Sequence, residues 1–296
     1  MAKLKKEPIT KDDMLEYLND YSDFSFEIKT LKLLLEDGLG CQHGGTYEDP
    51  VTKKNREFDI RAIKIHNNLT LRLAIECKNL REYSPLLISC VPRKENEAFH
   101  EVCLSYYSRP TTGPERYMED LGAGIYTKNV RLDSERSIYK VGEPVGKSCD
   151  QIGRELHGDQ NLVANNSDVY EKWSQALGSA DDLVHSACIK GNDQSDNIYF
   201  SLVIPLLVVP NGRLWVVHYD ENGNRTCDPK SEDRCSYYVN IPYSPLLGIK
   251  RGYFNISHLE FVTVDGLLEL IDDLTGSEGK FENSFQAEYA EQTLYS

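Results

Sequence analysis

Two carboxylates and a lysine in the first third of the chain have types and a spacing that could do chemistry together. Asp59 lies in the run EFDIRAIKIH, and Glu76 and Lys78 lie at the end of the next run, LTLRLAIECK. Paired carboxylate oxygens are ligands that hard divalent cations prefer in proteins. Whether these side chains meet depends on the elements that carry them.

The two runs are predicted to form a β-hairpin, because only Asn67-Asn68 separates them. Asparagine tolerates the positive φ that tight primed turns require. A two-residue loop sets the register of the hairpin, so that Asp59 faces Glu76. Directly opposed side chains lie about 4.5–5.5 Å apart, and Lys78, two residues beyond Glu76, points to the same face. The register therefore predicts an Asp/Glu/Lys cluster in which two like charges need a cation between them.

A helix that precedes the hairpin carries a third carboxylate. We expect one helix to begin after Thr10 and a second to begin after Asp23 and end at Gly38. In the second helix an apolar face is predicted from Phe24, Ile28, Leu31 and Leu35, which recur at helical spacing. Glu27 projects near this face, where a carboxylate seldom lies without a partner. The cation between Asp59 and Glu76 could be that partner.

At these residues the sequence resembles the PD-(D/E)xK nuclease superfamily, whose restriction-endonuclease-like fold has an αβββαβ core. The segments FDIRA and AIECKN carry the resemblance. Asp59 matches the metal-binding Asp of the family, Glu76 and Lys78 match its E-x-K pair, and Glu27 is similar to the acid on its first helix. One residue departs from the motif, because Phe58 rather than proline precedes Asp59.

The resemblance implies a catalytic set and a cofactor. Asp59, Glu76 and Lys78 would be catalytic, and Glu27, Asp59 and Glu76 would hold Mg²⁺, with Mn²⁺ as a substitute. The metal polarises the scissile phosphate and activates a water in such enzymes. In such enzymes the lysine orients or deprotonates that water and stabilises the charged transition state. The alternative interpretation is a solvent-facing salt-bridge cluster in which Glu57 opposes Lys78.

The resemblance covers about residues 24–80 and extends more weakly to the segment GKSCDQIGRELH. The longer string EDPVTKKNREFDIRA also resembles uncharacterised bacterial nuclease-like proteins. We predict a helix over about 146–157, on which Lys147 and Gln151 would lie near the phosphates of a nucleic acid. A basic patch beside the hairpin is a second predicted phosphate contact; its members are Lys53, Lys54, Arg56 and Arg61.

The charge of the chain limits its partners. Its 33 basic and 47 acidic side chains give a net charge of −14, and residues 151–296 carry most of the excess. A protein that coats nucleic acid through phosphates is expected to be basic, so general coating of nucleic acid is not expected here, and phosphate chemistry is expected in the first half. The acidic second half favours a protein partner or regulated substrate access. A homodimer is a further expectation.

Composition and pattern favour one α/β domain. We expect a restriction-endonuclease-like αβββαβ core over residues 1–275, with a mixed central sheet flanked by helices. It would include an N-terminal helix and a loop-rich insertion near 79–140, and a polar tail would occupy 276–296. Further helices are predicted over 168–190 and in DGLLELIDDL, and IYFSLVIPLLVV is predicted to be a buried central strand. The eight cysteines form no C-x-x-C pair, and neither a signal peptide nor a membrane span is recognisable, so we expect a cytoplasmic protein.

The hypothesis that follows is Mg²⁺-dependent hydrolysis of phosphodiester bonds. By resemblance, the protein is expected to be a DNA endonuclease in prokaryotic defence or DNA processing. The first alternative is a catalytically silent nuclease-fold protein that acts as a binding or assembly subunit. RNA as the substrate is a lesser alternative.

Overall fold

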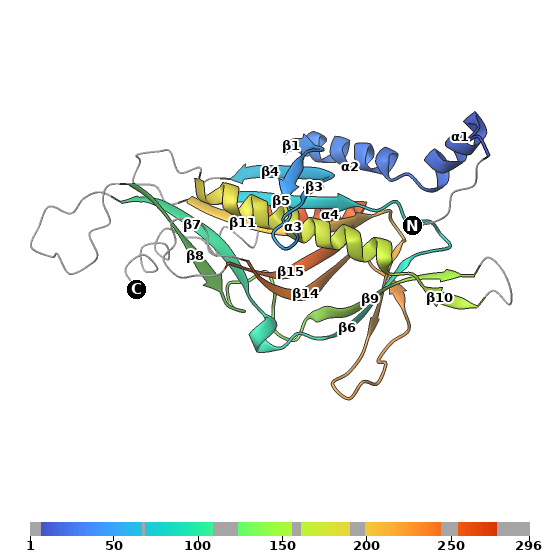
Figure 1. Cartoon of the computed structure of the whole chain (residues 1–296). Coiled ribbons are helices and arrows are strands. Elements are labelled where there is room, and N and C mark those ends of the chain that lie inside the picture. The colour runs from blue at the N-terminus through green and yellow to red at the C-terminus, as the bar shows by residue number, and fades with distance from the viewer. Residues whose placement is uncertain are drawn as a thin grey trace, which may run out of the picture.

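The computed structural model describes residues 7–66, 69–108, 124–155, 161–189, 199–243 and 254–276 (Figure 1). The helices are α1 (Lys11–Asp20), α2 (Phe24–Glu36), α3 (Ser167–Ile189) and α4 (Val264–Thr275), with a short 3₁₀ helix, η1 (Glu95–Glu97). The strands are β1 (Gly40–His43), β2 (Thr46–Glu48), β3 (Asn55–Glu57), β4 (Ile60–His66), β5 (Leu69–Cys77), β6 (Leu86–Pro92), β7 (His100–Ser108), β8 (Gly124–Leu132), β9 (Pro144–Arg154), β10 (Leu162–Ala164), β11 (Tyr199–Val209), β12 (Leu214–His218), β13 (Lys230–Ser231), β14 (Arg234–Tyr243) and β15 (Phe254–Thr263).

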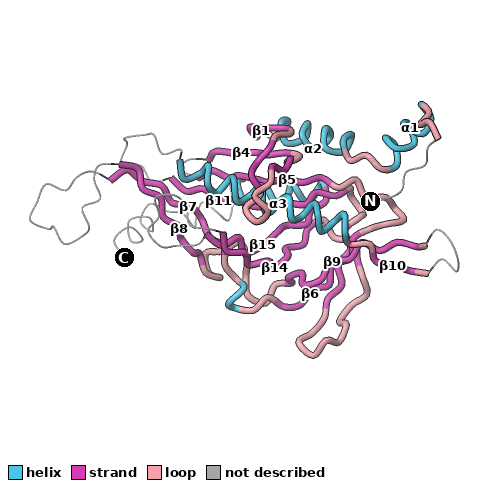
Figure 2. The backbone as a smooth tube through the Cα atoms, viewed as in Figure 1, coloured by secondary structure: helices cyan, strands magenta, loops and turns pink. Residues whose placement is uncertain are grey.

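A large mixed sheet runs through the molecule, with helices on both faces (Figure 2). Its main path has the order β1-β4-β5-β11-β15-β14-β9-β6-β12-β13. One face of β5 and β11 shares a hydrophobic core with α2 and α4, and the opposite face packs against α3. The predicted α/β class, with a mixed sheet flanked by helices, is therefore confirmed.

The hairpin has the predicted register. β4 and β5 pair antiparallel from Ile60 opposite Ile75 to His66 opposite Leu69. The turn residues 67–68 themselves lie outside the described residues. Strand alternation places Ile75 in the core beside α2 and α4 and turns its neighbour Glu76 toward α3. The sequence pattern thus decides which helix the Glu76 carboxylate meets.

The run predicted as a central strand forms β11, which is buried along almost its whole length. It pairs parallel with β5 on one side and parallel with β15 on the other. A parallel strand with both faces covered has no need for polar alternation, and this explains its continuous apolar sequence. The predicted helices over 168–190 and in DGLLELIDDL are also confirmed, as α3 and α4.

The helix predicted over about 146–157 is wrong, because Pro144–Arg154 form strand β9. β9 pairs antiparallel with β6, and Gly146 lies where β6 and β14 approach it most closely. A Cβ at Gly146 would come within 2.7 Å of side-chain atoms of both Ile88 and Tyr237. Close packing between three strands, which local pattern does not reveal, overrides the helical spacing of this segment.

The region near 79–140 is also less irregular than predicted. It contains β6, β7 and β8, and β7 and β8 form a long antiparallel ladder. Residues 109–123, which include most of the Pro- and Gly-containing part of this region, lie outside the described residues. The same is true of residues 277–296, so the predicted polar tail is outside them apart from Gly276.

The apolar face predicted for the second helix is not the face that packs on the sheet. α2 buries Phe26 and Leu34 together with Thr30. Phe24 and Leu35, on the predicted face, are 57% and 53% exposed. Both faces have apolar residues at helical spacing, so the periodicity alone cannot say which one the sheet covers.

Two buried histidines predict that the fold loses stability in mild acid. Burial lowers the pKa of His258 to about 2 and that of His100 to about 3, because a buried imidazolium loses its hydration. Unfolding returns both groups to values near 6.5, so the unfolded chain binds more protons below that pH. Stability is therefore fully present above about pH 6.5 and falls with pH, by about 2 kcal/mol per histidine at pH 5.

Chemical denaturation at pH 7.5 and pH 5 measures this loss. His258→Phe keeps a ring against Tyr139, whose ring centroid lies 3.7 Å from that of His258, but removes the titration. The difference in unfolding free energy between the two pH values should shrink in this variant. An unchanged difference would contradict the assignment.

Candidate active site

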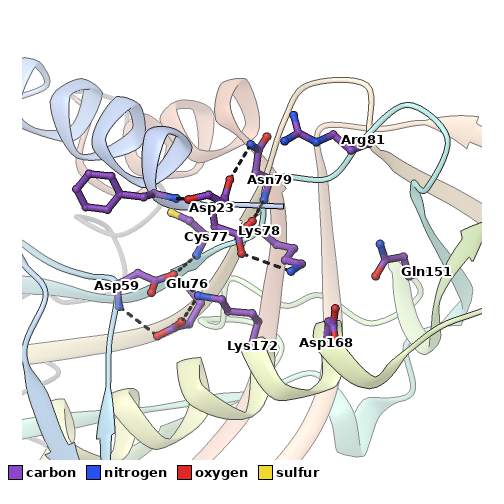
Figure 3. A network of polar contacts seen from close by, with 12 residues as sticks. Asp23, Asp59, Glu76, Cys77, Lys78, Asn79, Arg81, Gln151, Asp168 and Lys172 are labelled. Atoms are coloured by element: carbon purple, nitrogen blue, oxygen red, sulfur yellow. Dashed lines mark hydrogen bonds and ion pairs between the residues drawn. The ribbon is translucent and has the colours of Figure 1, made fainter. Parts of the chain in front are cut away.

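Asp59, Glu76 and a lysine from a distant helix form the centre of the site (Figure 3). Asp59 immediately precedes β4, Glu76 lies at the end of β5, and Lys172 lies near the start of α3. The Lys172 Nζ donates to Asp59 Oδ2 at 2.7 Å and to Glu76 Oε2 at 3.3 Å. The hairpin thus brings the two predicted carboxylates together, and α3 supplies a cation between them.

The electrostatics of this cluster follow from burial. The side chain of Glu76 is 1% exposed, and burial raises its pKa well above the usual range; the negative charge of Asp59 raises it further. Burial alone would lower the pKa of Lys172, but the charges of Glu76 and Asp59 outweigh burial and raise it. Lys172 therefore stays protonated, and its positive charge lies beside the two carboxylates.

The backbone also holds this pair in place. Asp59 Oδ2 accepts a hydrogen bond of 2.8 Å from the backbone N–H of Cys77, and the backbone N–H of Asp59 donates to Glu76 Oε1 at 3.4 Å. Each carboxylate is thus tied to the opposite strand of the hairpin. Cys77 itself is buried and turned into the core beside α2.

Lys78 lies at the same end of the hairpin but pairs with a different carboxylate. Its Nζ lies 3.4 Å from Asp23 Oδ2, and its backbone N–H donates to the carbonyl of Val208 in β11. Asp23 was predicted to cap α2, but its side chain makes no capping bond; its Oδ1 accepts from the backbone N–H of Asn79 at 2.8 Å instead. Asp23 therefore positions the segment that follows β5, including Lys78.

Asp59, Lys78 and Lys172 line one open cavity of about 260 Å³. The other lining residues are Glu57, Asp168, Glu171 and Gln175. The carboxylates of this rim would repel phosphates unless cations compensate them. The cavity is therefore a better environment for a divalent cation than for a bare anion.

Glu27 lies near this centre without touching it. Its Oε2 lies 3.6 Å from His43 Nε2. Burial raises the pKa of Glu27, and the negative charge of Asp59 raises it further. The helix that precedes the hairpin thus brings Glu27 within electrostatic reach of Asp59, and its contact is a histidine of β1.

The two arginines of the predicted basic patch make contacts within the protein. Arg61 Nη1 donates to Asp182 of α3 at 2.7 Å, and its guanidinium lies 4.1 Å from the centre of the Phe58 ring. Arg56 Nη1 lies 3.4 Å from Glu171, which lines the cavity. Both arginines therefore join the hairpin region to α3.

The two lysines of the patch are more exposed. Lys53 has a positive φ of 57° in the turn between β2 and β3, and its Nζ lies 3.9 Å from Glu48. Lys54 is exposed in the same turn, and its side chain makes no hydrogen bond or ion pair with other described residues. Of the patch, Lys54 is thus the residue most available to a phosphate.

Lys147 and Gln151 lie on strand β9 instead of a helix. Lys147 Nζ donates to Glu97 at 2.8 Å and lies 4.4 Å from the centre of the Tyr238 ring. Lys147 does not line the cavity. Gln151 does not line the cavity either, and its Nε2 donates to Ser84 at 2.9 Å. Neither of these two predicted phosphate contacts therefore lies at the cavity.

The donor set fits a hard divalent cation. Among the described residues no three His, Cys, Asp or Glu side chains lie close enough together to hold a metal by themselves. Mg²⁺, however, is commonly held by one or two carboxylates, with waters and substrate phosphates completing its shell. Asp59 and Glu76 form such a pair. The ammonium of Lys172 contacts both carboxylates, which shows that a positive charge fits between them.

Lys172 is the functional candidate that sequence reasoning missed. It lies between Val169 and Ala176 on one face of α3, and both of these residues are buried. A lysine on an apolar face is the same signal that singled out Glu27. The chain position of Lys172, 113 residues from Asp59, gives no indication of its partners.

No family model matches the chain, and no curated protein or solved structure shows significant similarity to it. Among the described residues, none of the helices is long and apolar enough to cross a membrane.

Proposed function

We propose that this protein is a Mg²⁺-dependent phosphodiesterase of restriction-endonuclease-like fold, and that its substrate is DNA. The observation that carries the proposal is the pair of carboxylates, Asp59 and Glu76, that meet at the end of a hairpin beside a cavity lined by two lysines. Hydrolysis of a phosphodiester needs a metal site, a positioned water and compensation of developing negative charge. This cavity offers residues for each.

The order of the elements around the site supports the fold assignment. Apart from β2 and β3, which form a separate two-stranded sheet between β1 and β4, and the elements between β5 and α3, the order α2, β1, β4, β5, α3, β11 is a helix, three antiparallel strands, a helix and a strand. The four strands are neighbours in the order β1-β4-β5-β11. This is the αβββαβ order of the expected core. Strands β6–β10 would then be an insertion between β5 and α3.

The roles of the residues follow from their positions. Asp59 and Glu76 would hold Mg²⁺, which when bound would supply a Lewis acid to the phosphate and lower the pKa of water in the cavity. Lys78, one residue past the strand that carries Glu76, orients the attacking water and compensates the charge that develops on the phosphate. Lys172 neutralises the carboxylate pair in the absence of metal, and Asp23 positions Lys78.

A second candidate function is supported by the charges at the cavity. The ammonium groups of Lys78 and Lys172 are both paired with carboxylates, and the rim carries Glu57, Asp168 and Glu171. Such a site would suit a nuclease-fold subunit that binds a protein partner and does not cleave nucleic acid. The acidic second half of the chain would then be the partner surface.

Incubation of the protein with supercoiled plasmid, linear duplex DNA and single-stranded RNA, with Mg²⁺, Mn²⁺ or EDTA, tests the proposal. Cleavage of DNA with either metal and none with EDTA is the expected result. Cleavage of RNA alone would replace DNA with RNA as the substrate. An absence of cleavage on every substrate, alone and with partners purified with the protein, would favour the silent subunit.

Metal binding is predicted to stabilise the fold independently of catalysis. Mg²⁺ that relieves the repulsion between Asp59 and Glu76 should raise the melting temperature by a few degrees at a concentration about 100 times its Kd. Asp59→Ala should abolish the shift, and Asp37→Ala should retain it, because Asp37 pairs with Lys64 away from the cavity. Coincident melts of the wild-type protein with and without 10 mM Mg²⁺ would argue against a metal site.

A further inference from the structure

The two N-terminal helices carry a heptad repeat that the candidate active site does not use. Its members alternate at spacings of three and four residues: Met14, Tyr17, Tyr21, Phe24, Ile28, Leu31 and Leu35. This is the a/d spacing of a coiled coil within each helix, and Tyr21 lies in the short non-helical break between α1 and α2. We call these residues the heptad seam.

The heptad seam lies on the outside of the protein. All of its members except Leu31 are between 40% and 66% exposed, and α1 buries none of its residues. α2 packs on the sheet through the opposite face, with Phe26, Thr30 and Leu34. Figure 1 shows α1 and α2 at the outer edge of the molecule. One face of α2 thus holds the fold together. On the other face Leu31 is half-buried against the core and the Phe24 ring lies 6.0 Å from that of His43, whereas Ile28 and Leu35 remain exposed.

An uncovered seam of this size is unusual on a soluble monomer. A ten-residue helix that buries none of its side chains is marginal in water, even with the Thr10–Asp13 capping box that begins α1 and the hydrogen bonds from Arg81 to its last carbonyls. At about 200 Å² for a large side chain, the exposed seam amounts to on the order of 700 Å² of apolar surface. This approaches the roughly 800 Å² that each partner contributes to a standard protein interface.

The charges beside the seam indicate its occupant. α1 carries four acidic residues, Asp12, Asp13, Glu16 and Asp20, and one lysine, Lys11. The exposed charges of α2 are Lys29, Lys32 and Glu36, and Glu36 lies 3.6 Å from Lys32. An acidic helix repels nucleic acid and anionic lipid surfaces. An antiparallel pair of identical helices instead places the acidic α1 of each copy beside the lysines of the other copy's α2. A parallel pair would place acid against acid.

We propose that the heptad seam is a homodimer interface, in which two copies of this chain pair antiparallel along α1 and α2 about a two-fold axis near Tyr21. A two-fold interface requires a self-complementary surface, and an apolar seam with the acidic α1 on one side of the axis and Lys29 and Lys32 on the other meets that requirement. In an antiparallel pair the a positions of one helix face the d positions of the other, so Tyr21 would pack against Phe24 of the second copy. The proposal is independent of the proposed catalytic activity.

Sedimentation equilibrium on the full chain between 1 and 100 μM tests the interface. The wild-type protein should be a dimer in this range, and Tyr21→Glu with Ile28→Glu should weaken dimerisation at least 100-fold. Leu15→Glu is the matched control, because Leu15 is a 45% exposed leucine on α1 outside the seam, and it should leave the dimer intact. A monomeric wild type, or a dimer that survives the double substitution, would overturn the proposal.

Cysteine cross-linking tests the orientation and needs no destabilising charge. In the antiparallel arrangement Tyr21→Cys lies near the two-fold axis, and it should form a covalent dimer under mild oxidation beyond the wild-type background. Met14→Cys lies far from the axis and should not. Efficient cross-linking of Met14→Cys but not of Tyr21→Cys would overturn the antiparallel pairing. Removal of residues 277–296 is a separate control: a dimer that persists without this segment excludes it as the chain that covers the heptad seam.

Discussion

Lys78→Ala is expected to lower the rate of DNA cleavage by at least about 10³-fold, while the affinities for Mg²⁺ and DNA stay within a factor of a few. The ammonium of Lys78 compensates negative charge that develops only as the phosphate is attacked, so its removal acts on kcat and little on ground-state binding. Single-turnover cleavage of a labelled duplex measures the rate. Filter binding in Ca²⁺ measures the affinity separately.

Two further variants make this result specific. Lys64→Ala removes a lysine of β4 that pairs with Asp37 away from the cavity, and it should cleave at the wild-type rate. Asp23→Asn weakens the 3.4 Å contact that positions Lys78 and should lower kcat less than Lys78→Ala, with KM unchanged. If Lys78→Ala cleaves as fast as the wild type, Lys78 has no catalytic role and Lys172 becomes the lysine to test.

Lys172→Met is expected to destabilise the metal-free protein by about 3 kcal/mol. It removes the only cation seen in contact with both Asp59 and Glu76 among the described residues, and it leaves a buried carboxylate beside another without compensation. The loss should be larger at pH 8 than at pH 5. The reason is that the raised pKa of Glu76 favours its neutral form in the folded protein as the pH falls, and a neutral carboxyl needs no partner.

Urea denaturation in EDTA at the two pH values measures this effect. Glu76→Gln in the Lys172→Met background should recover most of the lost stability, because it removes one of the two like charges. Mg²⁺ should stabilise Lys172→Met more than the wild type, since no ammonium competes for the carboxylates. A variant with wild-type stability at pH 8 would show that the Lys172 contacts contribute nothing to the fold.

The hairpin is the part of the candidate site that the sequence by itself determined. A two-residue turn and the strict alternation of side chains along each strand leave one register. That register places Asp59 opposite Glu76 independently of the rest of the chain. The central strand β11 is similar, because a long apolar run with few polar residues has no stable place outside a covered sheet. The hairpin register and the buried strand both follow from turn length and from the apolar pattern, and residues close together in the sequence define both.

The helix faces were decided by the tertiary structure. α2 has apolar residues on two faces, and only its position against the sheet selects Phe26 and Leu34 for burial. The segment that carries Lys147 has helical spacing, yet it forms β9 because β6 and β14 accept it as a strand. Periodicity reports that a segment has an apolar side, but it does not identify the neighbour that covers that side.

The partners of the charged residues were likewise decided by the tertiary structure. Lys172 reaches Asp59 only because α3 packs on the face of the sheet toward which Glu76 points. Lys78 meets Asp23 because the start of α2 lies beside the end of β5. Charges act through space over a few ångströms, whereas the sequence orders residues along the chain. The residues that carry charge could therefore be identified from the sequence, but the opposite charges they meet depended on the packing of distant elements.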